Sequence, residues 1–154
     1  MEEDVLRLLK DRGIFLHEIA EIVYFLQKPY SKSLDIRGCI HAVERVLKKR
    51  EVQHAVLTGI ALDILAEQKK LPFPLQEIVE KDEPLYGIDE VLALGIINIY
   101  GSIGFTSFGY LDKQKTGAIG RLHYMQDRVH TFLDDIIAAI AAAAAAKIAH
   151  KYND

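Results

Sequence analysis

The sequence is poor in cysteine and has no large excess of charge of one sign, and both absences exclude classes of protein. Cys39 is the single cysteine among 154 residues, so no disulfide can form within the chain, which fits a reducing cytosol. The 19 basic and 22 acidic side chains give a net charge of −3 and are spread along the chain, unlike the basic footprint of a nucleic-acid-binding protein. The acidic start, residues 1–4, is the reverse of a secretory signal. We therefore expect a cytoplasmic protein that does not bind nucleic acid.

Apolar runs long enough to cross a membrane are also missing. The uncharged run at residues 136–146 has 11 residues and is mostly alanine, whereas a membrane span needs roughly 20 apolar residues. The segment 91–105 is longer but contains polar residues and three glycines. We interpret both segments as buried helices of a soluble domain. In the alanine run, small side chains with high helix propensity would let neighbouring helices approach closely.

Several well-known site motifs are absent as well. No His/Cys spacing resembles a zinc site, and His17, His123 and His130 are scattered, so we assign them no metal. The sequence contains no Walker loop, no dinucleotide fingerprint and no nucleophile elbow. Chemistry, if the chain performs any, depends on other residues.

Helical periodicity is what the sequence has in abundance. With 154 residues, of which 50% are hydrophobic, we expect one domain with a real core, spanning residues 1–154. Apolar residues recur every three or four positions, and no strand-like alternation competes with them. The first two predicted helices are expected to form a hairpin. The fold class is therefore predicted to be all-α, a multi-helix bundle with a buried Ala-rich C-terminal helix. The helices predicted in the first half are Glu3–Asp11, Leu16–Gln27, Ile36–Leu47, Glu51–Gln68 and Leu75–Glu80.

The stretch from residue 86 to residue 146 holds six polar groups that are hard to explain as solubilising surface alone. Each acidic pair lies at the start or the edge of a strongly apolar segment, which a helix would have to bury. Its carboxylates therefore lie at the edge of a buried face, where charged groups need hydrogen-bonding or ionic partners. Carboxylate oxygens from three segments would form the hard-ligand site that Mg²⁺ prefers, and a nearby lysine would suit a phosphate. Our first hypothesis is therefore metal-assisted phosphate chemistry. The six groups are Asp89, Glu90, Asp112, Lys115, Asp134 and Asp135.

Ordinary explanations exist for the first four of these groups. Asp89 and Glu90 lie near the start of a helix predicted to continue through Ile97, where acids complement the helix dipole. Asp112 and Lys115, three residues apart, would form a common surface ion pair if their segment is helical. The sequence alone leaves both alternatives open.

The last acidic pair coincides with a predicted helix start. Thr131 and Asp134 match a capping box, in which Thr131 accepts from the backbone N–H of Asp134. Such a box accounts for Asp134 but leaves Asp135, and it places both acids in the first turn, where both can reach one site. Asp63 also interrupts an apolar run, and we expect its head group to lie in solvent rather than in a site.

The order of these motifs resembles the phosphatidylglycerophosphatase A family, and within it the soluble YutG-like branch. Any one motif would be a weak signal, but three in the same order make chance agreement improbable. The segments that carry the resemblance are Ile88–Glu90, Phe108–Lys115 with Ile119, His130–Ala139 and, for the YutG-like branch, Glu18–Gln27 and Lys49–Gln53.

This resemblance implies a Mg²⁺-dependent hydrolase of lipid metabolism that converts phosphatidylglycerophosphate to phosphatidylglycerol. The carboxylates would hold the metal, the metal would polarise the phosphoryl group and activate water, and the lysine would neutralise charge. Carried over by position, the implied catalytic residues are Asp112, Lys115 and Asp135, and the implied metal ligands are Asp89, Glu90, Asp134 and Asp135.

Two departures from the membrane-bound members of the family bear on the substrate. This chain has neither their N-terminal Gly-rich Pro-Gly-Thr motif nor their spanning helices, and Thr116–Gly117 follows Lys115 where they show a proline-rich turn. A soluble phosphate ester and a phospholipid headgroup met transiently at a membrane surface both fit. The alternatives are a non-catalytic helical binding or regulatory module and, ranked last, an all-α nucleotide pyrophosphatase suggested by Glu18-x-x-Glu21. Smooth Ala- and Gly-rich helices slightly favour a homo-oligomer.

Overall fold

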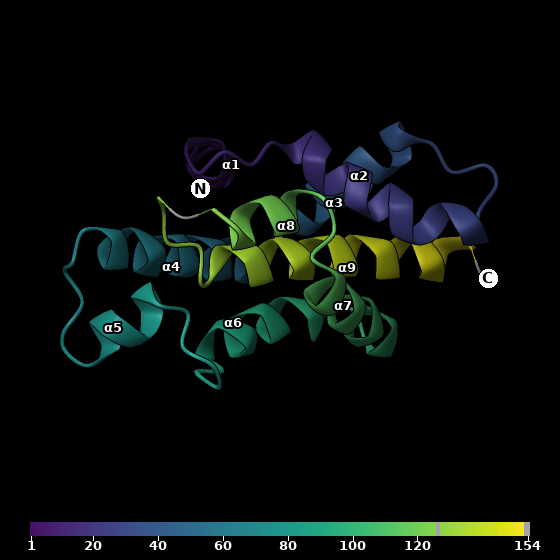
Figure 1. The fold of residues 1–154 in the computed structure, drawn as a ribbon. Coiled ribbons are helices and arrows are strands. Elements are labelled where there is room, and N and C mark those ends of the chain that lie inside the picture. Colours follow the sequence, from purple (N-terminus) through teal and green to yellow (C-terminus); the bar gives the residue numbers. More distant parts are fainter. Residues whose placement is uncertain (126, 153–154) are drawn as a thin grey trace.

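The computed structural model describes residues 1–125 and 127–152, without the side chains of Ser102 and Tyr152, and within these ranges every regular element is a helix (Figure 1). The predicted all-α fold is confirmed, and the predicted helices of the first half agree with the structure to within one residue at each end. The elements are α1 (Glu2–Asp11), α2 (Leu16–Gln27), the short 3₁₀ helix η1 (Lys28–Tyr30), α3 (Ile36–Leu47), α4 (Arg50–Glu67), α5 (Leu75–Glu80), α6 (Ile88–Ile97), α7 (Ser102–Gln114), α8 (Ala118–His123) and α9 (Leu133–Tyr152).

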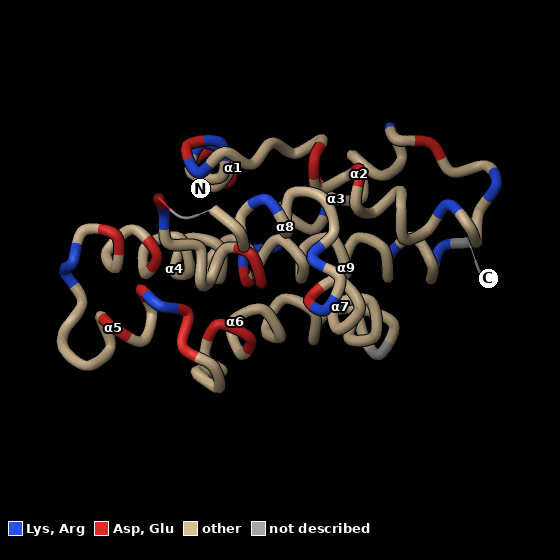
Figure 2. The backbone as a smooth tube through the Cα atoms, viewed as in Figure 1, with Lys and Arg blue, Asp and Glu red and all other residues tan. Residues whose placement is uncertain are grey.

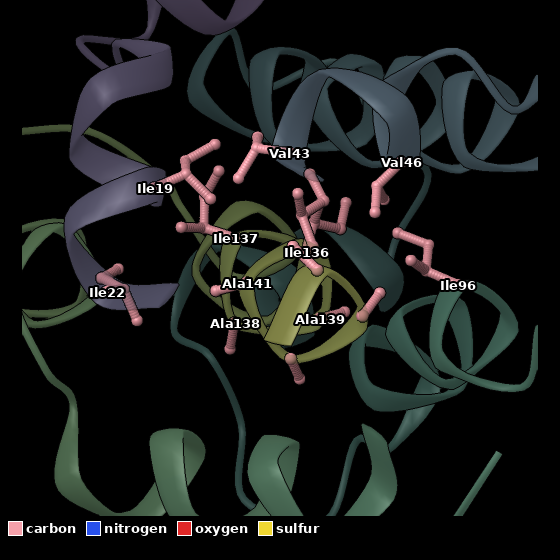
Figure 3. Packing of buried hydrophobic residues seen from close by; sticks show 14 of the residues in the cluster. Ile19, Ile22, Val43, Val46, Ile96, Ile136, Ile137, Ala138, Ala139 and Ala141 are labelled. Carbon is pink, nitrogen blue, oxygen red and sulfur yellow. The ribbon is translucent and has the colours of Figure 1, made fainter. Parts of the chain in front are cut away.

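Helix α9 runs through the middle of the molecule, and α2, α3, α6 and α7 all pack against it (Figure 1). Every side chain from residue 136 to residue 146 is fully buried, as expected for a helix that is apolar on all sides. Figure 3 looks along α9 and shows Ile19, Val43 and Ile96 approaching it from three other helices. Each fully buried isoleucine contributes about 1.5–3 kcal/mol of hydrophobic stabilisation. The predicted buried Ala-rich helix is confirmed, and α9 forms the centre of the core.

None of the helices in the described ranges is both long and apolar enough to cross a membrane. The interpretation of the two most apolar segments as buried helices is confirmed for 136–146 only, because Val91, Ile99 and Phe105 in the segment 91–105 are exposed.

The segment 91–105, which the sequence predicts as one helix, is two helices in the structure. Helix α6 ends at Ile97, and α7 begins at Ser102 after Gly101, whose φ of +83° is a left-handed conformation that glycine adopts at little cost. The prediction failed because the apolar composition continues across the break. The break lets α7 pack along α9, which places the C-terminal end of α7 near the N-terminal end of α9.

The predicted hairpin of the first two helices is also wrong, because α1 packs mainly against α4. Arg12, which follows α1 and is only 5% exposed, fixes this arrangement. Its Nη2 lies 2.6 Å from Oε1 of Glu67 at the end of α4 and donates to the carbonyl oxygen of Val129, also at 2.6 Å. The N–H of Val129 in turn donates to Glu67. This largely buried ion pair ties α1 and α4 to the loop that leads into α9.

Candidate active site

A pocket of about 360 Å³ lies where the N-terminal ends of α6 and α9 meet the C-terminal end of α7. Figure 2 shows the acidic segments of α6, of α9 and of the connector before α6 gathered in the same part of the molecule. All six polar groups that the sequence singled out line this pocket, together with two acids from the connector. The carboxylates in its wall are those of Asp82, Glu83, Asp89, Glu90, Asp112, Asp134 and Asp135, and Lys115 is the cationic residue among the lining groups.

Asp134 and Asp135 lie in the first turn of α9 and are 3% and 5% exposed. Oδ1 of Asp134 accepts a hydrogen bond from the backbone N–H of Asp135 at 2.7 Å. Oδ2 of Asp134 lies 3.2 Å from Nδ1 of His123 and 3.9 Å from Nζ of Lys115. The carboxyl groups of Asp89 and Asp112 lie within hydrogen-bonding reach of Asp135. Adjacent acids on α9 therefore serve different parts of one pocket.

The N-terminus of α9 is capped by a residue that the sequence analysis placed in solvent. Asp63 of α4 is completely buried, and its two carboxylate oxygens accept hydrogen bonds from the backbone N–H groups of Phe132 and Leu133, at 3.0 and 2.9 Å. These donors have no partner within the helix. The predicted capping box is wrong, since Thr131 donates its hydroxyl proton to the carbonyl oxygen of Val79 instead. The cap is a tertiary contact and has no local signature.

Asp112 and Lys115 meet at the C-terminal end of α7, as their spacing predicts. Nζ of Lys115 lies 3.0 Å from Oδ1 of Asp112, and Lys115 itself has left-handed backbone angles, φ 52° and ψ 49°. Burial alone would lower the pKa of Lys115, but the hydrogen bond to Asp112 and the charge of Asp134 outweigh it and raise the pKa. The pair lines the pocket, and its lysine is protonated at neutral pH.

Gly120, in α8, makes room for this turn. A Cβ at Gly120 would collide with the backbone carbonyl oxygen of Lys115, whereas a Cβ at Gly109, on the exposed side of α7, would meet nothing within 4 Å. We expect Gly120→Ala to lower the free energy of unfolding by about 1–3 kcal/mol, because the backbone around Lys115 has to shift. The matched variant Gly109→Ala should instead stabilise α7 by about 0.5–1 kcal/mol. Urea unfolding of both variants checks this pair, and equal effects would contradict the proposed role of Gly120.

Crowding of carboxyl groups dominates the electrostatics of the pocket. Burial raises the pKa of Asp134 to about 8. Burial and then the charge of Asp134 raise the pKa of Asp135 to about 10, and Asp89 and Asp112 add to the shift. The pKa of Glu90 is also raised, by burial and by Asp112. Without a cation, Asp134 and Asp135 therefore keep their protons at neutral pH, and ionising the whole set would leave more negative charge than Lys115 can neutralise. A divalent cation with oxygen ligands fits this deficit, and Mg²⁺ prefers such ligands.

The family model for phosphatidylglycerophosphatase A matches residues 8–150 of this sequence. The chain belongs to the phosphatidylglycerophosphatase A family. The resemblance carried by the three acidic motifs is thereby confirmed, and the match extends well beyond them into the first half of the chain.

Members of the phosphatidylglycerophosphatase A family with similar sequences include two proteins of Bacillus subtilis strain 168. The uncharacterised protein YpjQ is 59% identical over 147 residues, which cover 96% of this chain and 83% of YpjQ. The uncharacterised protein YutG is 57% identical over 152 residues, which cover 98% of this chain and 92% of YutG. The crystal structure of the low temperature requirement C protein from Listeria monocytogenes superimposes with a TM-score of 0.96 at 54% identity, covering 99% of this chain and 97% of that one.

In this phosphatidylglycerophosphatase A pocket region, the sequence analysis passed over Asp82, and its assignment of no metal to His123 needs correction. Asp82 comes from the turn after α5, and His123 ends α8. One ligand atom each from Asp82, His123 and Asp134 lies within 4.8 Å of the others, an arrangement that could hold a metal ion. The sequence spacing of these three residues does not predict the group. They come together only because α8 and the turn after it place His123 beside α9. The separate catalytic and ligand roles given to the six predicted residues stay predictions.

Proposed function

We propose that this chain is a Mg²⁺-dependent phosphomonoester hydrolase of the phosphatidylglycerophosphatase A type. The observation that carries the proposal is the convergence of Asp89, Asp112 and Asp135, from three helices, on one pocket that also contains Lys115. A set of separate solvated carboxylates would have fitted a binding module equally well. Convergence of like charges is costly, and it favours a site whose charge is balanced by a metal ion.

The residues of the pocket divide into those that would hold the metal and those that would act on the phosphate. Asp89, Glu90, Asp134 and Asp135 would be the ligands. A bound Mg²⁺ would supply Lewis-acid polarisation of the phosphoryl group and a more acidic water molecule. Lys115 neutralises charge on a phosphoryl oxygen, since its ammonium group donates to phosphate as a point charge.

Two further features of the pocket favour the binding of a phosphate group next to Lys115. Asp112 accepts from Lys115 at 3.0 Å and so directs the ammonium group along the pocket wall. The N-terminal ends of α6 and α9 both face the pocket, and a helix N-terminus favours an anion through its dipole. The N–H groups of Phe132, Leu133 and Asp135 already donate to carboxylates of the protein, so α9 contributes its dipole rather than free N–H groups. Lys115 and the two helix N-termini would thus orient a phosphate ester once a cation balances the carboxylates.

An apolar groove beside the acidic pocket favours a lipid ester over a soluble one. The groove, of about 530 Å³ between α4 and α6, is lined by Leu62, Ile88, Val91 and Phe132 among others. Ile88 immediately precedes Asp89, so the groove and the acidic pocket adjoin at the start of α6. Leu85, on the rim of the acidic pocket, is fully exposed. We infer that phosphatidylglycerophosphate, presented at a membrane surface, is the substrate class that this arrangement suits.

The nucleotide pyrophosphatase alternative has lost its main support. Glu18 is used structurally, because its carboxylate pairs with Arg121 and accepts from the backbone N–H of Phe15. Glu21, the other half of the motif, is exposed on α2.

Release of inorganic phosphate tests the proposal. The assay compares phosphatidylglycerophosphate in mixed micelles with soluble phosphomonoesters and nucleotides, each with Mg²⁺ and with EDTA. We expect release that requires Mg²⁺ and is fastest with the lipid. Release that persists in EDTA would contradict the metal-dependent mechanism. No release from any substrate, with Mg²⁺ binding intact, would instead support a non-catalytic module that retains the fold.

A further inference from the structure

The carboxylate of Asp134 lies between two pockets, with Oδ2 3.9 Å from Nζ of Lys115 and 3.2 Å from Nδ1 of His123. Its Oδ2 faces His123, and beyond it lies a separate pocket of about 210 Å³. Asp82 and Asp134 line both this pocket and the larger acidic one, whereas His123 lines only the smaller pocket. The two pockets therefore share a wall made of carboxylates, and the far side of that wall carries an imidazole.

We propose that Asp82, His123 and Asp134 form a second divalent-cation subsite, which shares Asp134 with the first and takes a borderline first-row ion such as Mn²⁺ or Zn²⁺. The inference rests on the proposed function in one respect, because Asp134 is also a ligand of the proposed Mg²⁺ site. The subsite itself stands on its own three side chains.

The geometry is close to that of a formed metal site. Ligand bonds of about 2.0–2.2 Å place the ligand atoms of one ion at most about 4.4 Å apart, when they lie on opposite sides of it. Each of the three side chains offers a ligand atom within 4.8 Å of the other two. Nδ1 of His123 lies 3.2 Å from Oδ2 of Asp134. Asp82 and His123 are exposed, so an ion and its water molecules can enter.

The two subsites differ in the type of ligand atom, and therefore in the metal ion that each prefers. The first is built from carboxylate oxygens, which suit Mg²⁺, whereas an imidazole nitrogen suits transition metals better. His123 is held by the edge-to-face packing of Tyr124, with ring centroids 4.8 Å apart. The other histidine of the small pocket, His130, is already engaged, because Nδ1 faces Arg12 and Nε2 faces Met125. His123 is thus the imidazole in this pocket that is placed to bind an ion.

An ion pair between protonated His123 and Asp134 is the ordinary explanation, and Mn²⁺ binding decides between the two. We would count Mn²⁺ sites on the full chain by titration calorimetry and by electron paramagnetic resonance. Wild type should bind two ions, and His123→Ala should bind one, with the affinity of the lost site reduced at least about 100-fold, the upper range seen even for loss of an outer partner. Excess Mg²⁺ should displace only one of the two ions from wild type.

A second ligand variant and two control variants test whether the loss of an ion is specific to this subsite. Asp82→Asn should also lose one ion, and it serves if His123→Ala fails to fold, because Asp82 lies in an exposed turn with φ 50°, a conformation that Asn tolerates. Exposed His41→Ala and Asp127→Asn should still bind two ions. A single Mn²⁺ site in wild type, or two sites retained in both His123→Ala and Asp82→Asn, would overturn the inference. Two ions without any phosphate release would refute the proposed function and leave this subsite standing.

Discussion

Asp135→Asn is expected to lower kcat/KM for phosphate release by about 10³-fold, the scale of losing one strong transition-state interaction, and yet to stabilise the metal-free protein. The carboxylate of Asp135 lies against Asp134, Asp89 and Asp112 in a pocket that is short of positive charge. Because the pKa of Asp135 is raised to about 10, the metal-free protein has to take up a proton at this carboxyl group on folding at neutral pH. A neutral amide of the same shape removes that cost. We expect a gain of about 0.5–2 kcal/mol in the free energy of unfolding, the usual exchange between stability and function at active sites.

Thermal unfolding with and without Mg²⁺ measures the second part of this prediction. Wild type should gain stability on addition of Mg²⁺, because a ligand that binds only the folded state shifts the unfolding equilibrium. Asp135→Asn should begin higher and gain little. Asp127→Asn, an exposed carboxylate outside the acidic pocket, is the control and should behave like wild type. A variant that is less stable than wild type in EDTA would contradict the charge-crowding account.

Asp63→Ala should have the largest effect on stability among the changes considered, although Asp63 does not line the pocket. The substitution leaves the buried N–H groups of Phe132 and Leu133 without acceptors, and each orphaned group costs about 1–3 kcal/mol. We expect a loss of about 2–5 kcal/mol in the free energy of unfolding and a fall in activity, because the first turn of α9 holds Asp134 and Asp135. Glu51→Ala, at an exposed position on α4, should stay within about 0.5 kcal/mol of wild type. Urea unfolding of the two variants makes the comparison, and equal effects would contradict the capping role.

The same residue predicts a pH dependence. Burial raises the pKa of Asp63 to about 7, although hydrogen bonds from Phe132 and Leu133 act in the opposite direction. The unfolded chain has a pKa of about 3.9 at this position, so the proton is held more tightly by the folded state. The stability from this group is complete below about pH 4 and is lost as the pH rises to about 7.

Asp63→Asn, which cannot titrate, isolates this contribution. The free energy of unfolding of wild type minus that of Asp63→Asn should fall as the pH rises from 4 to 7. A difference that stays constant or rises across this range would contradict the assignment.

Much of the fold follows from local patterns in the sequence. The bounds of α2 and α5 agree with the predicted ranges, because apolar periodicity and flanking prolines fix them locally. The alanine run predicted a buried helix because small side chains permit close packing on all sides. The break at Gly101 was missed because apolar residues resume after it, although Asn98, Gly101 and Ser102 are residues that often interrupt a helix.

The candidate site was predictable in part, for a physical reason. Acids that open apolar helices, such as Asp89 and Asp135, are recognisable because a buried face begins beside them. Asp63 and His123 were not, because their partners lie far away in the sequence or across a turn. The bond from Phe132 to Asp63 joins residues 69 positions apart, and no spacing rule reaches that far. Only the packing of α4 and α8 on α9 creates these contacts.

The central claim is that carboxylates from α6, α7 and α9 form one divalent-cation site that presents a phosphate to Lys115. The most direct measurement is a crystal structure of the protein grown with Mn²⁺ and inorganic phosphate, with the ion located by its anomalous scattering. The account predicts an anomalous peak in contact with Asp89 and Asp135, and a phosphate oxygen within hydrogen-bonding distance of Nζ of Lys115. A pocket without an anomalous peak at saturating Mn²⁺, or a peak with the phosphate bound elsewhere, would contradict it.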